Sequence, residues 1–152
     1  MTGMTEKGYA RFFARGITGI LFFMAGWWKC FELTPMQHAR GMFVEGFADT
    51  WIPAFLLWGL GLAIPVVELV AGALLVAGFR TREAAIALGF ILLIVTYGHA
   101  LKEPLFSIQG HIFPRGVFLL LALALPASED RYALDNLLRR STPGTDSPPG
   151  AR

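Results

Sequence analysis

One acidic residue lies deep inside the most apolar part of the chain. Glu68 is the only charged residue in the run 58–78 and falls near its middle. A carboxylate in such surroundings is costly unless it is neutral, has a partner or faces a wet cavity. Pro65 lies three residues earlier and frees a backbone carbonyl near Gly61, which favours a pocket. Glu68 is therefore either a proton acceptor at a quinone or substrate pocket, or a structural partner for Arg15 or for backbone groups.

A second polar group gathers around the loop that follows residue 101. It comprises Tyr97, His99, His111 and Arg115, with Gln109 and His38 as additional members. Hydrogen-bond donors of these types suit the carbonyl oxygens of a quinone head group. Two alternatives are haem or metal binding by His99 and His111, and a polar cluster that only caps helix ends. Because the two histidines have no diagnostic spacing, we predict no metal site.

Two basic residues lie in the first apolar stretch. Arg15 is about one turn inside it, so its side chain reaches either the membrane surface or Glu68. Lys29 follows Trp27 and Trp28, a combination typical of an anchor at the membrane interface. We assign Arg15, Glu68 and Lys29 to structural pairing. Glu68 is also the one candidate proton group, and no catalytic residue is predicted beyond it.

Long apolar stretches must position these residues. Hydrophobic residues make up 55% of the 152-residue chain and charged residues only 16%, with a mean hydropathy of +0.54. Soluble domains are about 25% charged, so much of this surface must face lipid. A helix that crosses a bilayer needs roughly 20 mostly apolar residues. The four predicted spans are about 12–28, 51–78, 84–101 and 112–125.

These spans predict an all-α integral membrane protein, an antiparallel four-helix bundle in one domain over residues 1–140. The segment 141–152 is rich in proline and glycine and is predicted to be a disordered cytoplasmic tail. Lys and Arg are enriched in cytoplasmic loops, and nine of the 13 lie on the side of the two chain ends. Both ends are therefore predicted to be cytoplasmic. The net charge of only +2 gives no support for nucleic-acid binding.

The segment 29–50, between the first two spans, has a pattern of its own. Thr34 and Gln37 fit a capping box, with Pro35 at the first helical position. Apolar residues then recur at helical spacing, namely Met36, Ala39, Phe43 and Phe47. We predict a short amphipathic helix on the membrane surface. Packing over the mouth of the bundle and binding a partner are both compatible with it.

Two further local patterns concern packing and the last helix. Two small-xxx-small pairs suit close helix packing, namely Gly59 with Ala63 and Ala85 with Gly89. Ser128 is suited to cap a final helix whose first turn holds Glu129 and Asp130.

Two motifs occur in order on the first and second spans. They read Arg15-x3-Gly19-x2-Phe22-x2-Ala25-Gly26-x2-Lys29 and Glu68-Leu69-x2-Gly72-x-Leu74-Leu75-x2-Gly78-x2-Thr81-Arg82. Over roughly residues 11–126 the chain resembles the DoxX family, within the DoxD-like group of small four-helix membrane proteins. The resemblance implies a multi-pass protein of the prokaryotic cytoplasmic (inner) membrane. Relatives are linked to sulfur-compound oxidation with quinone as acceptor, and to membrane complexes that handle oxidative stress.

Two functions from different classes follow. The first is a membrane subunit associated with a quinone-linked redox or electron-transfer complex, with quinone as its cofactor and other membrane or redox proteins as partners. The second is a non-catalytic accessory subunit that stabilises a larger membrane complex. The sequence has no nucleotide, flavin or multi-cysteine motif, so an enzyme acting alone is not expected. A transporter is a weaker third option, because four short helices would have to oligomerise to form a path.

Overall fold

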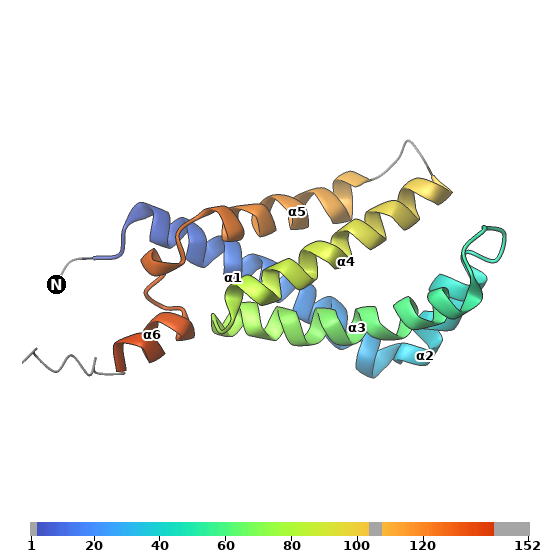
Figure 1. Ribbon diagram of the computed structural model, residues 1–152, viewed down its shortest axis with the longest axis horizontal. Coiled ribbons are helices and arrows are strands. Elements are labelled where there is room, and N and C mark those ends of the chain that lie inside the picture. Colours follow the sequence, from blue (N-terminus) through green and yellow to red (C-terminus); the bar gives the residue numbers. More distant parts are fainter. Residues whose placement is uncertain (1–2, 104–107, 142–152) are drawn as a thin grey trace, which may run out of the picture.

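The computed structural model describes residues 3–103 and 108–141, with side chains at 3–103 and 112–139 (Figure 1). Every regular element in these residues is helical, which confirms the all-α prediction. The long helices are α1 (Glu6–Trp27), α3 (Ala54–Ala77), α4 (Thr81–Lys102) and α5 (Ile108–Ala124). The shorter elements are η1 (Trp28–Glu32), α2 (Pro35–Gln37), η2 (His38–Glu45), η3 (Ala127–Glu129) and α6 (Leu134–Ser141).

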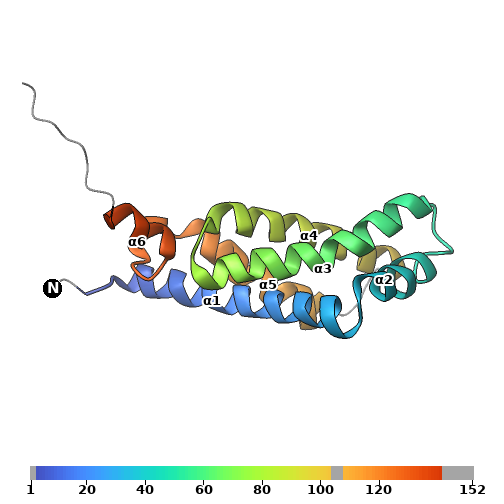
Figure 2. The ribbon, with the colours of Figure 1, turned by 90° about the horizontal axis from the view of Figure 1, so that it is seen from below.

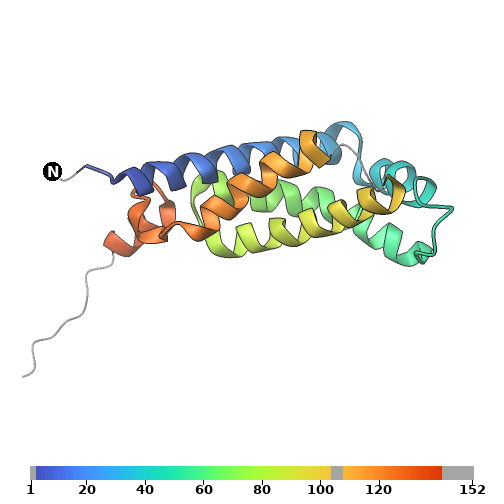
Figure 3. The ribbon, with the colours of Figure 1, turned by 90° about the horizontal axis from the view of Figure 1, so that it is seen from above.

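The four long helices lie alongside one another in an elongated molecule (Figures 2 and 3). α1 packs most extensively on α3, and α5 contacts both α1 and α4. The start of α1 and α6 lie at one end, which we call the α6 end. The segments η1, α2 and η2 lie at the other, the α2 end. Buried side chains from all four long helices form the core, with Phe22, Leu75, Leu88 and Leu119 among them.

Within the described residues, two helices are long and apolar enough to cross a membrane. These are α3, with 24 residues and a mean hydropathy of 2.3, and α4, with 22 residues and 2.0. α5 contributes a shorter apolar helix, Ile112–Ala124. Large apolar side chains face outward along α4 and α5, such as Phe90, Leu93 and Leu120, each more than 60% exposed. Such a surface suits lipid better than water.

Glycines allow α1 and α3 to approach each other closely. A Cβ atom on Gly26 would lie 2.3 Å from the backbone nitrogen of Leu69. One on Gly72 would lie 2.4 Å from the backbone nitrogen of Phe23, and one on Gly19 would also meet α3. Any larger residue at these positions would push the two helices apart. Three glycines of the two sequence motifs, Gly19, Gly26 and Gly72, thus permit the close packing of α1 on α3.

The small-xxx-small pairs predicted from sequence have a lesser role. Gly59 has nothing within 4 Å of its Cβ position and Ala63 is exposed, so the prediction of a packing contact there is wrong. Ala85 is buried in the core, and the Cβ position of Gly89 lies 3.7 Å from Leu119. That second pair faces α5 at ordinary van der Waals distance.

The segment between α1 and α3 is helical, as the capping signal predicts. The Thr34 hydroxyl accepts a hydrogen bond from the Gln37 backbone N–H at 3.3 Å, and Pro35 begins α2. Thr34 has a φ of 69°, a strained conformation for a β-branched residue. The helix continues as η2, which packs on α3, with Ala39 fully buried against Gly61. Packing over the end of the long helices is therefore the arrangement observed.

The last helix does not begin where its capping signal indicates. Ala127–Glu129 form one turn of 3-10 helix, and α6 starts only at Leu134. The predicted cap at Ser128 is therefore wrong, because Asp130 leaves the helical path to pair with α1. Of the predicted tail 141–152, Ser141 ends α6 and residues 142–152 lie outside the described residues.

Candidate functional site

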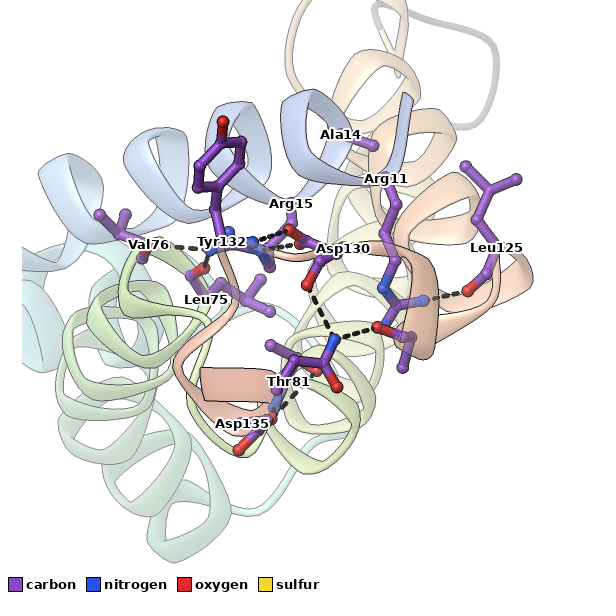
Figure 4. Close-up of polar contacts among 12 residues, drawn as sticks. Arg11, Ala14, Arg15, Leu75, Val76, Thr81, Leu125, Asp130, Tyr132 and Asp135 are labelled. Carbon is purple, nitrogen blue, oxygen red and sulfur yellow. Dashed lines mark hydrogen bonds and ion pairs between the residues drawn. The ribbon is translucent and has the colours of Figure 1, made fainter. Parts of the chain in front are cut away.

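A buried ion pair joins α1 to the segment that follows α5. The Nε of Arg15 donates to an Asp130 carboxylate oxygen at 2.8 Å, and both side chains are at most 2% exposed (Figure 4). Arg15 also donates through Nη1 to the Leu75 carbonyl and, at 2.8 Å, to that of Val76. These carbonyls end α3, where a cation is favoured. The expectation that Arg15 extends to the membrane surface or pairs with Glu68 is therefore wrong.

The start of α6 closes the turn between α3 and α4 at the same end. One carboxylate oxygen of Asp135 accepts from the Arg80 backbone N–H at 2.9 Å, and the other accepts from that of Thr81 at 3.2 Å. In return, the Asp135 backbone N–H donates to the Gly78 carbonyl at 3.0 Å. Gly78 has a φ of 72°, which favours glycine. This end is thus a satisfied structural network (Figure 4).

Glu68 finds its partner toward the α2 end. Its Oε2 accepts from Lys29 Nζ at 2.6 Å, with exposed fractions of 3% for Glu68 and 19% for Lys29. Lys29 lies in η1, directly beyond the close approach of α1 and α3 at Gly26. Of the three predicted pairing residues, the structure thus brings Lys29 and Glu68 together and places Arg15 elsewhere. Lys29 is not merely an interfacial anchor.

A cavity of about 350 Å³ lies next to this ion pair, and we call it the His38 cavity. It is lined by residues of η1, η2, the turn after η2, α3 and α4. Its polar side chains are those of Lys29, His38 and His99. The remaining lining residues are apolar or glycine, namely Gly41, Met42, Phe43, Gly46, Phe47, Ile64, Ile94, Val95 and Gly98. A few polar groups inside apolar walls are typical of small-molecule sites.

The His38 side chain lines this cavity and is hydrogen-bonded to a backbone carbonyl of α3. Pro65 has no N–H, so the carbonyl of Gly61, four residues earlier, lacks its usual donor within α3. The Nδ1 of His38 lies 2.7 Å from this oxygen, and the imidazole is only 2% exposed. Burial is the main cause that lowers the pKa of His38 below its usual value. The neutral ring is therefore the favoured form.

Two of the other predicted quinone-site residues, Tyr97 and Arg115, lie away from the His38 cavity. Tyr97 lines a separate groove with Trp51, and its side chain is 52% exposed. Arg115 lies over the Phe22 ring, 5.5 Å from its centre. The side chain of His111 lies outside the described residues, as does that of Gln109. Of the three assigned residues whose side chains the structure describes, Tyr97, His99 and Arg115, only His99 lines this cavity.

Two residues of these sites were underestimated from the sequence. Asp130 was assigned to a helix turn, and no local signal relates it to Arg15, 115 positions away. His38 was only an additional member of the predicted polar group. The freed carbonyl that Pro65 creates near Gly61 was a usable signal, because it requires a donor from another element.

The fold and the site define an all-helical membrane protein with long apolar helices and a small, mostly apolar cavity that carries three polar side chains. The chain belongs to the DoxX family, whose model matches residues 10–100. That range runs from α1 to α4 and includes every residue that lines the His38 cavity. Neither the curated proteins nor the solved structures include one that matches the chain.

Proposed function

We propose that this protein is a membrane subunit of a quinone-linked redox complex and that the His38 cavity holds the quinone head group. The observation that carries the proposal is the placing of Lys29, His38 and His99 in one apolar cavity beside a buried carboxylate. A quinone ring needs apolar walls for its faces and polar groups for its oxygens. The cavity volume of about 350 Å³ falls within the range of small-molecule pockets.

Lys29 is the cation best placed to meet a head-group oxygen. Its ammonium has three donors and uses one for Glu68, which leaves donors for a ligand. Glu68 is not among the residues that line the cavity, and its ion pair with Lys29 positions the ammonium group. A quinone carbonyl bound to Lys29 would be polarised by its full positive charge.

Electrons would reach this site from another protein. The sequence contains no nucleotide, flavin or multi-cysteine motif, and its single cysteine cannot form an internal disulfide. The chain would therefore bind and orient the quinone, while a redox partner supplies or takes the electrons. This division of work makes the protein a subunit associated with an oxidoreductase rather than an enzyme on its own.

The proposal places four spans in the prokaryotic inner membrane as an antiparallel bundle, with the α6 end cytoplasmic and the His38 cavity at the outer side. The excess of Lys and Arg at the α6 end supports this orientation. In a Cys30→Ser background, we expect Thr145→Cys to react with a membrane-impermeant thiol reagent only after permeabilisation. Arg40→Cys should react in intact cells. Labelling of Thr145→Cys in intact cells would contradict the orientation.

The second candidate function is that of a non-catalytic accessory subunit. It is favoured by a groove of about 390 Å³ between α4 and α5, where Gly89 and Gly116 leave room among exposed apolar side chains. Small residues of this kind allow a further membrane helix to approach closely. Isolation of a stable assembly that carries no quinone would favour this function over the first.

Filling the His38 cavity tests the quinone proposal. Val95 lines the cavity on α4, so Val95→Trp should fill it and prevent the head group from entering. We expect protein extracted in mild detergent to retain quinone, measured by mass spectrometry, and the variant to lose at least about tenfold. Val117→Trp is the matched control, because Val117 faces outward from α5 and is 39% exposed. Equal quinone in all three proteins would overturn the proposal.

A further inference from the structure

The hydrogen bond between His38 and Gly61 determines which nitrogen of the ring carries a proton. The Gly61 carbonyl oxygen can only accept, and it lacks its usual donor in α3 because Pro65 has no N–H. The ring nitrogen 2.7 Å away must therefore donate to it. In a neutral imidazole the other nitrogen is then an acceptor with a free lone pair. Pro65 thus fixes the His38 tautomer from a neighbouring helix.

The acceptor nitrogen of His38 borders the His38 cavity. The His38 side chain is only 2% exposed, yet it lines the cavity. Within residues 3–103 and 112–139, its Nε2 makes no hydrogen bond. No fully buried polar side-chain atom among those residues is left without a hydrogen-bond partner. Because Nε2 has no such partner, it cannot be fully enclosed by protein, and it borders the cavity that His38 lines. It offers a ligand an acceptor, whereas Lys29 offers donors.

We propose that the His38 cavity selects the reduced, hydroxyl-bearing form of the head group, with a quinol hydroxyl donating to His38 Nε2. This inference rests on the proposed function and names the redox form that the cavity prefers. An oxidised quinone has only carbonyl acceptors and gains nothing from an acceptor nitrogen. A quinol hydroxyl donates to His38 and can also accept from Lys29.

The charged and titratable groups around His38 are few. Lys29 of η1 and His99 of α4 line the same cavity, and Glu68 of α3 lies behind Lys29. On η2 itself, Arg40 and Glu45 pair with each other at 3.0 Å and are both exposed. Protonation of His38 would place a proton on Nε2 and remove the acceptor. Because burial lowers the pKa of His38, the acceptor is present at neutral pH and is lost in acid.

Calorimetric titration of the detergent-solubilised full chain with duroquinol and duroquinone under argon tests this preference. We expect duroquinol to bind about fivefold more tightly at neutral pH, the value of roughly one hydrogen bond. Below the His38 pKa, its affinity should fall by up to about tenfold per pH unit, as for a single proton. The affinity for duroquinone should lack this His38-dependent fall.

Three variants assign the effect to His38. A glutamine can donate to Gly61 and accept from a ligand without titrating, so His38→Gln should bind duroquinol but lose the acid fall. His38→Leu should lose the preference for duroquinol. Arg40→Gln is the control, because Arg40 is an exposed residue of η2 outside the cavity lining, and it should keep both preference and acid fall. Equal binding of both compounds by the parent, or an acid fall that persists in His38→Gln, would overturn the inference and leave the proposed function standing. Binding of neither compound would overturn both.

Discussion

Asp130→Ala is expected to lower the free energy of unfolding by about 3–5 kcal/mol, because it leaves the buried Arg15 guanidinium without a carboxylate. The loss should be large because Arg15 and Asp130 are at most 2% exposed and the bond joins α1 to the segment after α5. Arg15 would keep the Leu75 and Val76 carbonyls and the Phe12 ring, none of which carries a negative charge. Unfolding in mixed detergent micelles, followed by circular dichroism, measures the change.

Asp49→Ala is the matched control for this variant. Asp49 also pairs with a cation, Lys102, at 2.8 Å, but the two side chains are 75% and 38% exposed. Exposed pairs contribute at most about 1 kcal/mol, so this variant should unfold almost as the parent does. Equal losses of unfolding free energy in the two variants would contradict a stabilising role for the buried Arg15–Asp130 pair.

Glu68→Ala is expected to have the second large effect, also about 3–5 kcal/mol, because Lys29 would lose its counter-charge inside the protein. The oxygen it loses lies 2.6 Å from Lys29 Nζ, and the carboxylate is 3% exposed. The same unfolding measurement applies. Glu45→Ala is its control, since Glu45 and Arg40 form an exposed pair. A Glu68→Ala protein as stable as the Glu45→Ala protein would contradict a buried ion pair.

The helices could be predicted because their signals are local. Long apolar runs indicate the long helices, and Thr34 with Pro35 marks the start of α2. Hydropathy alone gives each predicted span about the position of a helix in the structure. The ends are less accurate, because α1 begins at Glu6 in a charged segment and α5 already at Ile108.

The ion pairs could not be predicted, because they depend on how helices lie against one another. Depth in the membrane made Arg15 a reasonable partner for Glu68, yet it cannot give the rotation of α1 about its axis. In the structure, Gly26 brings the end of α1 onto α3 at Leu69, which places Lys29 beside Glu68. Arg15 meets the end of α3 instead, where the carbonyls of Leu75 and Val76 attract a cation.

The position of the candidate site could be predicted only in part, and its quinone chemistry stays a prediction. A polar group suited to a quinone was expected from residues near 97–115, and of its members with described side chains in that range His99 alone lines the His38 cavity. The other polar residues come from η1 and η2, elements far from α4 in sequence. Their approach depends on the bond between His38 and Gly61 and on Ala39 packing against Gly61. The one indication of this contact in the sequence is Pro65, which leaves the Gly61 carbonyl without its usual N–H donor.

The most direct test of the central claim, that Lys29 and its cavity hold a quinone head group, is the quinone content of a double variant. Lys29→Met with Glu68→Leu replaces the ion pair by apolar side chains of similar size, which is often neutral or stabilising. We predict that the purified double variant has a free energy of unfolding close to that of the parent. Its quinone content should be lower by about tenfold or more, because Lys29 no longer offers a cation to the cavity. A stable double variant that carries as much quinone as the parent would contradict the claim.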